Sequence, residues 1–293
     1  MIHSRLLFSL SLVIVMALSA CASAPPPPPK QWQEYERQTA SGHEKYQHGY
    51  IEQAQHAYLR ALAHAELADS SERIVAASIN LGACALQLDQ PNEAARAYAR
   101  AVREARLAKL PVLEWQAQSG LAEAMRRSGD ARRALALYAA RPDAVTLPNN
   151  VRAAAELARA QALADVQQSS EAEQLMTSLE GSLRAQPAPS PWLATWYLTR
   201  ARILLQAGQL DAAQSAALAA LDLDRALHHP PSVADDHRLL GDIAERKGQV
   251  DLARDHRERA AAIYRHTGQK VRLQEVTSPA GMIHPASKQP TEK

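Results

Sequence analysis

A repeated pattern with a step of about forty residues constrains the fold of this chain more than any other feature. A small residue, first Gly42 and then Gly82, recurs along the sequence, and an alanine stands twelve residues after it in each of six copies. These alanines are Ala54, Ala94, Ala134, Ala172, Ala213 and Ala253. Repetition at a fixed period of this size indicates an array of similar helical or strand units.

A tight turn is expected in the middle of each copy. Seven residues after the small position, glycine stands in four copies, at Gly49, Gly129, Gly208 and Gly248, while Asp89 and Gln167 occupy it in the other two. Glycine adopts the positive φ that ends many helices without steric cost. Aromatic residues are only 4% of the chain, and the alanine-rich text is broken by Leu, Gln, Glu and Arg. This composition is typical of closely packed helices, so we expect an all-α fold of helix-turn-helix units.

The order of small residue, turn glycine, alanine, aromatic residue and alanine resembles the tetratricopeptide repeat. The first copy has Gly42, Gly49, Ala54, Tyr58 and Ala61, and the second has Leu81, Gly82, Ala94, Tyr98 and Ala101. The resemblance implies an α-solenoid of about six repeats that forms a right-handed superhelix, in which small residues let paired helices approach closely. The repeats are expected near 35–74, 75–114, 115–152, 153–193, 194–233 and 234–268.

The expected solenoid occupies residues 34–276, includes a capping helix near Val271–Val276, and is followed by a disordered tail at 277–293. Repeats of this family usually have about 34 residues. We therefore expect about six additional residues per copy, in longer second helices or in the loops between repeats. In the third copy, Arg141 stands at the position of the last repeat alanine and is followed by Pro142, so the second helix of this copy is expected to end early.

The start of the chain predicts export and lipidation. A short apolar stretch from Leu6 to Leu18 leads into Leu18-Ser19-Ala20-Cys21, which resembles the lipobox of bacterial lipoproteins. The resemblance implies a signal peptide at 1–20 and a lipid anchor on Cys21, and Ala22 favours the outer membrane with the folded part facing the periplasm. An ordinary secretory signal is the alternative. The linker at 21–33 contains five consecutive prolines, which adopt an extended polyproline II path.

The groove-facing positions of the expected first helices are the candidate binding residues. They are Thr39, His43, Tyr46, Asn80, Ala83, Gln87, Glu123, Arg126, Arg127, Arg202, Gln206, Arg238, Asp242 and Arg246. We expect Arg126, Arg127 and Arg202 to lie on one concave wall, where their guanidinium groups bind a discrete segment of a protein partner. The clamp with which some family members hold a C-terminal carboxylate is not reproduced, because Thr39 and His43 occupy its positions. The net charge of +2 gives no indication of nucleic-acid binding.

No phosphate-binding glycine loop, nucleophile elbow or zinc-protease helix is found in the sequence. One group of residues has side chains that suit zinc: His228, His229, Asp235, Asp236 and His237. We favour a different interpretation, a solvated loop at Pro230 and Pro231 followed by aspartates that begin a helix. We therefore expect a non-enzyme without cofactor: a lipoprotein that positions a protein partner in envelope, pilus or secretion assembly. The alternative is a metal-binding or enzymatic lipoprotein on the same array. Cys84 is expected to be an unpaired buried residue.

Overall fold

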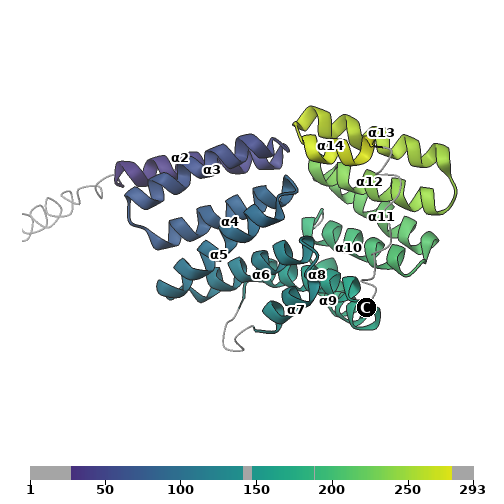
Figure 1. Ribbon diagram of the computed structural model, residues 1–293, viewed down its shortest axis with the longest axis horizontal. Coiled ribbons are helices and arrows are strands. Elements are labelled where there is room, and N and C mark those ends of the chain that lie inside the picture. Colours follow the sequence, from purple (N-terminus) through teal and green to yellow (C-terminus); the bar gives the residue numbers. More distant parts are fainter. Residues whose placement is uncertain (1–27, 141–146, 188, 279–293) are drawn as a thin grey trace, which may run out of the picture.

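The computed structural model describes residues 28–140, 147–187 and 189–278. Cys21, the expected signal segment, Arg141, Pro142 and nearly all of the expected tail lie outside the described residues. Within them, thirteen α-helices follow one another and no strand occurs (Figure 1). The helices are α2 (Lys30–Gln47), α3 (Ile51–Leu67), α4 (Ser71–Gln87), α5 (Pro91–Leu107), α6 (Pro111–Arg127), α7 (Ala131–Ala139), α8 (Asn149–Asp165), α9 (Ser169–Arg184), α10 (Pro191–Gln206), α11 (Leu210–Ala226), α12 (Pro230–Arg246), α13 (Val250–Thr267) and α14 (Lys270–Thr277).

The helix pairs confirm the all-α solenoid and show where the additional residues of each repeat lie. The four helices from α3 to α6 have 17 residues each and are joined by three-residue connections. The second helices are therefore long, as expected, but the first helices are equally long and the loops are short, so the additional residues lie in both helices. Helix α7 is shorter, with 9 residues. Helix α2 begins four residues before the expected solenoid, at Lys30.

The short connections share one backbone geometry. After α2, the N–H of Gly49 donates to the Tyr46 carbonyl (3.0 Å) and the N–H of Tyr50 donates to the Lys45 carbonyl (2.9 Å). This is the Schellman arrangement, in which one residue takes a left-handed conformation. That residue is glycine at Gly49, Gly129, Gly208, Gly248 and Gly268, and another residue type at Asp69, Asp89, Lys109, Gln167 and His228. The tight turn therefore forms with or without glycine.

The small positions of the repeat let the helices approach closely. All six repeat alanines are buried, and none exposes more than 3% of its surface. A Cβ atom added to Gly82 would lie 2.6 Å from the ring of Tyr98, and one added to Gly120 would lie 2.2 Å from the same ring. Tyr98 is thus held between α4 of its own repeat and α6 of the next. The aromatic residue of one repeat links it to the following repeat.

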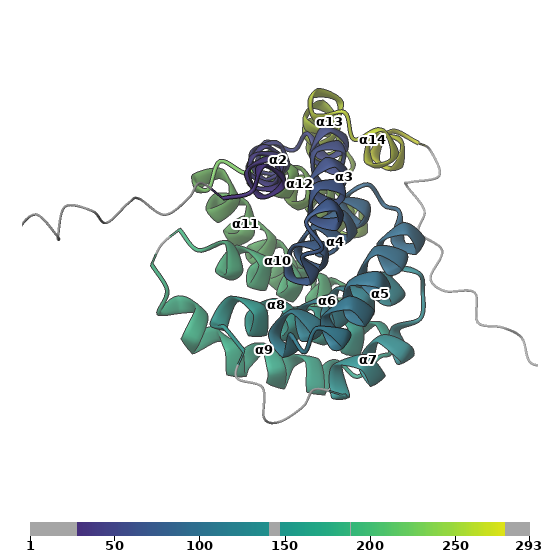
Figure 2. The same ribbon diagram turned by 90° about the vertical axis from the view of Figure 1, so that its left-hand side faces the viewer.

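The superhelix turns far enough that its two ends meet (Figures 1 and 2). A Cβ atom on Gly49, at the tip of the first hairpin, would lie 2.8 Å from Thr267 and 3.0 Å from Pro231. Helix α14, which includes the expected cap, packs on α13 and buries Arg272 and Val276. The concave side of the solenoid is consequently bounded by the first and last repeats together. Within the described residues, no helix is long and apolar enough to span a membrane.

Candidate functional site

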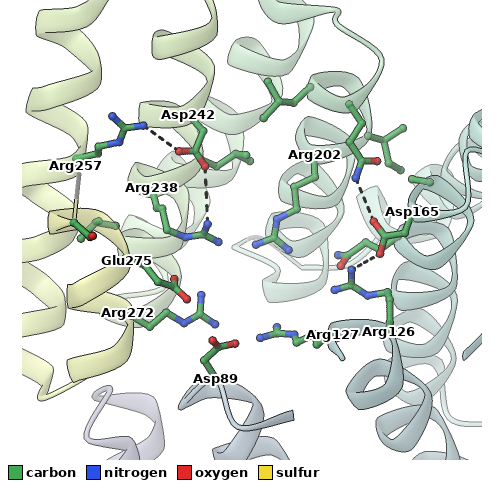
Figure 3. A pocket seen from close by; sticks show the side chains of 18 of the residues that line it. Asp89, Arg126, Arg127, Asp165, Arg202, Arg238, Asp242, Arg257, Arg272 and Glu275 are labelled. Carbon is green, nitrogen blue, oxygen red and sulfur yellow. Dashed lines mark hydrogen bonds and ion pairs between the residues drawn. The ribbon is translucent and has the colours of Figure 1, made fainter. Parts of the chain in front are cut away.

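A cavity of about 740 Å³ lies on the concave side of the solenoid, mainly between the first helices of repeats three to six (Figure 3). Helices α6, α8, α10 and α12 contribute the ends of their inner faces, α14 forms one side, and the α4–α5 turn contributes Asp89. Its charged lining residues are Asp89, Arg126, Arg127, Asp165, Arg202, Arg238, Asp242, Arg257, Arg272 and Glu275. Six arginines therefore face four carboxyl groups.

On the α6 side, the arginines are held by a buried carboxylate. Arg126 donates to Glu123 from Nε (2.8 Å) and Nη2 (2.9 Å), and it reaches Asp165 from Nη1 (2.7 Å). Arg127 donates to Glu123 from Nε at 2.9 Å. Burial alone would raise the pKa of Glu123, but the hydrogen bonds and charges of the two arginines outweigh it and lower the pKa to about 2. Glu123 is therefore a fixed anion that positions this wall.

On the opposite side, α12, α13 and α14 contribute three more arginines. Arg272 donates from Nη1 to Asp235 at 3.0 Å, and the Tyr264 hydroxyl donates to the same carboxylate at 2.7 Å. Burial would raise the pKa of Asp235, but the charges of Arg272, Arg238 and Arg202 lower it to about 2.

The remaining two arginines of this side share one carboxylate. Arg257 lies 3.5 Å from Asp242 and also pairs with Glu245, while Arg238 lies 3.9 Å from Asp242. The Nε atoms of Arg238 and Arg272 are buried and have no hydrogen-bond partner.

Arg202 differs from the other five arginines. Within the described part of the chain, no hydrogen bond or ion pair to its guanidinium occurs, and its side chain points into the middle of the cavity (Figure 3). Its guanidinium lies deep, although the residue keeps some surface open to the cavity. Burial lowers the pKa of Arg202 to about 10, and the charges of Arg238, Arg127 and Arg126 contribute to the decrease. Arg202 is thus a cation deep in the cavity that lies near three arginines and within the field of Asp235, and it has no direct ion-pair partner among the described residues.

The structure brings six of the expected groove residues together in this cavity: Arg126, Arg127, Arg202, Gln206, Arg238 and Asp242. Arg126 and Arg127 line the same cavity as Arg202, but both are already engaged by Glu123. Thr39, His43 and Asn80 instead line a separate pocket of about 400 Å³ between the first repeats.

The other expected groove residues have structural contacts. Arg246 lies outside the cavity lining and donates to the Leu205 carbonyl (2.9 Å), as Arg127 does to the Leu86 carbonyl (3.1 Å), so each ties one repeat to the previous one. Tyr46 hydrogen-bonds Gln87, and burial raises its pKa to about 12. Ala83 also lies outside both pockets.

Several cavity residues were not expected from the sequence. Gln161 and Asp165 belong to α8 of the fourth repeat, Asp89 lies in a turn, and Arg272 and Glu275 belong to the capping helix. Burial raises the pKa of Glu275, and the nearby Asp89 carboxyl raises it further. Arg257 could have been recognised from the sequence, because it replaces the aromatic residue of the repeat in the sixth copy. The other residues become neighbours only when the superhelix closes.

The histidine and aspartate group does not form a metal site. Asp235 is engaged by Tyr264 and Arg272, His229 contacts Ser232 (2.8 Å between Nδ1 and Oγ), and the ring of His237 lies against that of His256. His228 occupies an exposed left-handed turn position. Across the described ranges, no group of three or more histidine, cysteine, aspartate or glutamate side chains is placed to hold a metal ion. Cys84 is buried and unpaired.

No protein-family model and no curated protein matches this sequence. Among solved structures, PlcR of Bacillus thuringiensis, in complex with the peptide PapR7 and DNA, is similar, with a TM-score of 0.58 and 10% identity over 71% of this chain and 76% of that chain. The fold is a tetratricopeptide-like solenoid. A tetratricopeptide repeat protein from Parabacteroides merdae gives a TM-score of 0.42 and 15% identity over 84% of this chain and 100% of that chain.

Proposed function

We propose that this protein is a scaffold whose concave cavity binds a segment of a partner protein. Arg202 carries the proposal. A buried charge without a partner is costly, so such groups are rare unless something outside the chain supplies the partner. Here the charge lies in a cavity that opens to the concave side, where a ligand can reach it. The similar structure of PlcR is that of a complex with a peptide, which supports this class of ligand.

Three charged groups in and behind the cavity lining favour binding over catalysis. Glu123 and Asp235 have a pKa of about 2, and Arg202 has a pKa of about 10. General acids and bases work best when their pKa lies near the operating pH. These groups keep one charge state over the whole neutral range, so they suit electrostatic recognition. We therefore propose a non-enzymatic role.

We further propose that the scaffold is a lipoprotein of the bacterial outer membrane that faces the periplasm and serves envelope, pilus or secretion assembly. The support is the sequence Leu18-Ser19-Ala20-Cys21, followed by Ala22. More than one acyl chain on Cys21 would give a stable anchor. The expected proline linker leads directly into the first helix at Lys30. The prolines would therefore hold the solenoid off the lipid surface.

The cavity can be blocked without removing a charge. Gln206 lines it and is exposed, and its amide donates to Asp165 at 3.2 Å. Gln206→Trp should fill the cavity, whereas Gln53→Trp, on the exposed face of α3, should leave it open. Membranes from cells that express each full-length variant are cross-linked, and the captured proteins are compared. We expect one partner to be captured by the wild type and by Gln53→Trp and to be lost with Gln206→Trp. Equal capture by all three contradicts the proposal.

A further inference from the structure

The first turn of the array differs from the other glycine turns in what lies against it. Gly49 is buried, and an added Cβ atom would lie 2.8 Å from Thr267 and 3.0 Å from Pro231 of the last repeat. At the same position of later repeats, the glycines are exposed and an added Cβ atom would meet nothing within 4 Å; these are Gly129, Gly208 and Gly248. We refer to the contact of Gly49 with Pro231 and Thr267 as the closing junction.

The last repeat presents a fixed surface at this junction. The Thr267 hydroxyl donates to the Ile263 carbonyl (2.9 Å) and accepts a hydrogen bond from the side-chain amide of Gln269 (3.0 Å). Rotation of the threonine would break both hydrogen bonds, and the ring of Pro231 is rigid. Gly49 therefore fits because it has no side chain, and a larger residue at this position must push the two ends apart.

Apolar packing does not cross the closing junction. The apolar cluster that contains Tyr35 and Tyr58 belongs to the first two repeats, and the one that contains Ala234 and Tyr264 belongs to the sixth repeat and the capping helix. Among the described residues, no apolar cluster contains side chains of both the first and the last repeat. Because burial of apolar surface is the main stabilising contribution, the closing junction is weaker than the connections between successive repeats.

Two carboxyl groups also meet beside the closing junction. Asp89 of the α4–α5 turn and Glu275 of α14 line the same side of the cavity (Figure 3). Burial raises the pKa of Glu275, and the charge of Asp89 raises it further, although Arg238 of α12 and Arg272 of α14 oppose the increase. The repulsion between the two carboxylates acts between the two ends of the superhelix and disfavours their contact.

We propose that the superhelix opens and closes at the closing junction. Asp89 lies on one side of this junction, and Arg272 and Glu275 lie on the other, yet all three line one cavity. Small rotations between repeats add up along an array, so a small change at each repeat separates the two ends. The cavity is therefore complete only in the closed form, and a ligand that contacts both sides favours that form. This inference goes beyond the proposed binding function and holds for any class of ligand.

The test measures the distance between the two sides of the closing junction in the full-length protein in detergent. Spin labels are attached to Glu44→Cys in α2 and Ala262→Cys in α13, which are exposed positions near the junction, and pulsed electron–electron double resonance gives their separation. Cys84 is buried, and the protein without the two added cysteines reports any labelling of native thiols. We expect two distances, a short one for the closed form and a longer one for the open form.

Three variants change the ratio of closed to open molecules in different ways. Gly49→Ala should decrease the ratio about tenfold, because the added methyl group overpacks the contact with Thr267 and Pro231. Gly129→Ala is the matched control: it has the same left-handed backbone but meets no atom within 4 Å, so the ratio should not change. Glu275→Gln should increase the ratio, because it removes the repulsion with Asp89.

A single distance in the wild type, whether short or long, overturns the inference. Equal decreases with Gly49→Ala and Gly129→Ala also overturn it, because the effect would then come from backbone strain and not from the junction. If circular dichroism shows that Gly49→Ala has lost helix, Glu275→Gln decides, and an unchanged ratio in that variant counts against the inference. The proposed function is tested separately by Gln206→Trp, so a rigid superhelix whose partner is lost with Gln206→Trp refutes the opening alone.

Discussion

Two helical glycines should respond to the same substitution with opposite signs. Gly120, in α6, faces the ring of Tyr98, and an added Cβ atom would lie 2.2 Å from it. Gly181, in α9, is exposed and has no atom within 4 Å of an added Cβ. Alanine at both positions gains about 0.8–1.0 kcal/mol of helix propensity over glycine. Only Gly120→Ala must also displace the buried tyrosine ring.

The net effect follows from these two contributions. Overpacking a well-packed core costs about 1–3 kcal/mol. Because the added Cβ atom lies so close to the ring of Tyr98, and that ring is held on both sides, we expect the cost of Gly120→Ala in the upper half of this range. Gly120→Ala should therefore lower the free energy of unfolding by about 1–2 kcal/mol after the gain in propensity. Gly181→Ala should raise it by about 1 kcal/mol. At about 2–4 °C per kcal/mol, the two melting temperatures should move apart by several degrees.

Urea denaturation followed by circular dichroism at 222 nm measures both variants. Tyr98→Leu adds a third arm, because a smaller side chain should relieve part of the cost of Gly120→Ala, and a double-mutant cycle measures that coupling. If Gly120→Ala stabilises the protein as much as Gly181→Ala does, Tyr98 does not link the second and third repeats, and the packing described above is refuted.

Three further predictions concern charge and anchoring. Asp224 and Asp236 are buried together between α11 and α12. Burial raises the pKa of Asp224 to about 6, and burial together with the Asp224 charge raises the pKa of Asp236 to about 9. Because the folded pKa values lie above the unfolded ones, stability is present at low pH and is lost as the pH rises through 6 and 9. Melting temperatures should therefore fall between pH 5 and pH 9. Asp236→Asn, which still faces Asp235 and Arg202, should make this fall smaller. Parallel curves for the wild type and the variant would show that Asp236 is not the cause of the pH dependence. Arg202→Met should raise the melting temperature of the unliganded protein, because a cation near three arginines and without a direct ion-pair partner is replaced by an apolar side chain of similar length. A lower melting temperature by differential scanning calorimetry would mean that Arg202 serves stability. Cys21→Ser should move the protein from the membrane to the soluble fraction. The intact mass of the wild-type protein should show added lipid, and the mass of an unmodified chain would contradict the proposed lipid anchor.

The fold could be predicted because its main determinants are local and periodic. Ala94 and its counterparts recur at a fixed interval, and Gly49 and Gly129 mark turns whose left-handed backbone favours glycine. The turns at Asp69, Lys109 and His228 could not be seen in the same way. There the hydrogen bonds of the Schellman arrangement impose positive φ on ordinary residues.

The site could be predicted only in part, for a different reason. Arg126, Arg202 and Arg238 lie on first helices, whose inner faces follow from the repeat register. Asp89 and Glu275 are far apart in the chain and meet because small rotations between repeats add up until the superhelix closes. The sequence also does not tell which arginines are engaged. Arg202 occupies the repeat position that Glu123 occupies in the third copy, one residue after the small residue. Only the placement of Glu123 and Asp165 shows that Arg126 is paired.

A cross-link formed from inside the cavity tests the central claim most directly. A photoreactive phenylalanine analogue replaces Gln206 in one full-length variant and Gln53 in another, and both are irradiated in native membranes. We expect the analogue at position 206 to form a single cross-linked product, and mass spectrometry should map the cross-link to one segment of another protein. The analogue at position 53 should not form it. The same product from both positions, or none from position 206 while the partner still binds, would show that the concave cavity is not the binding site.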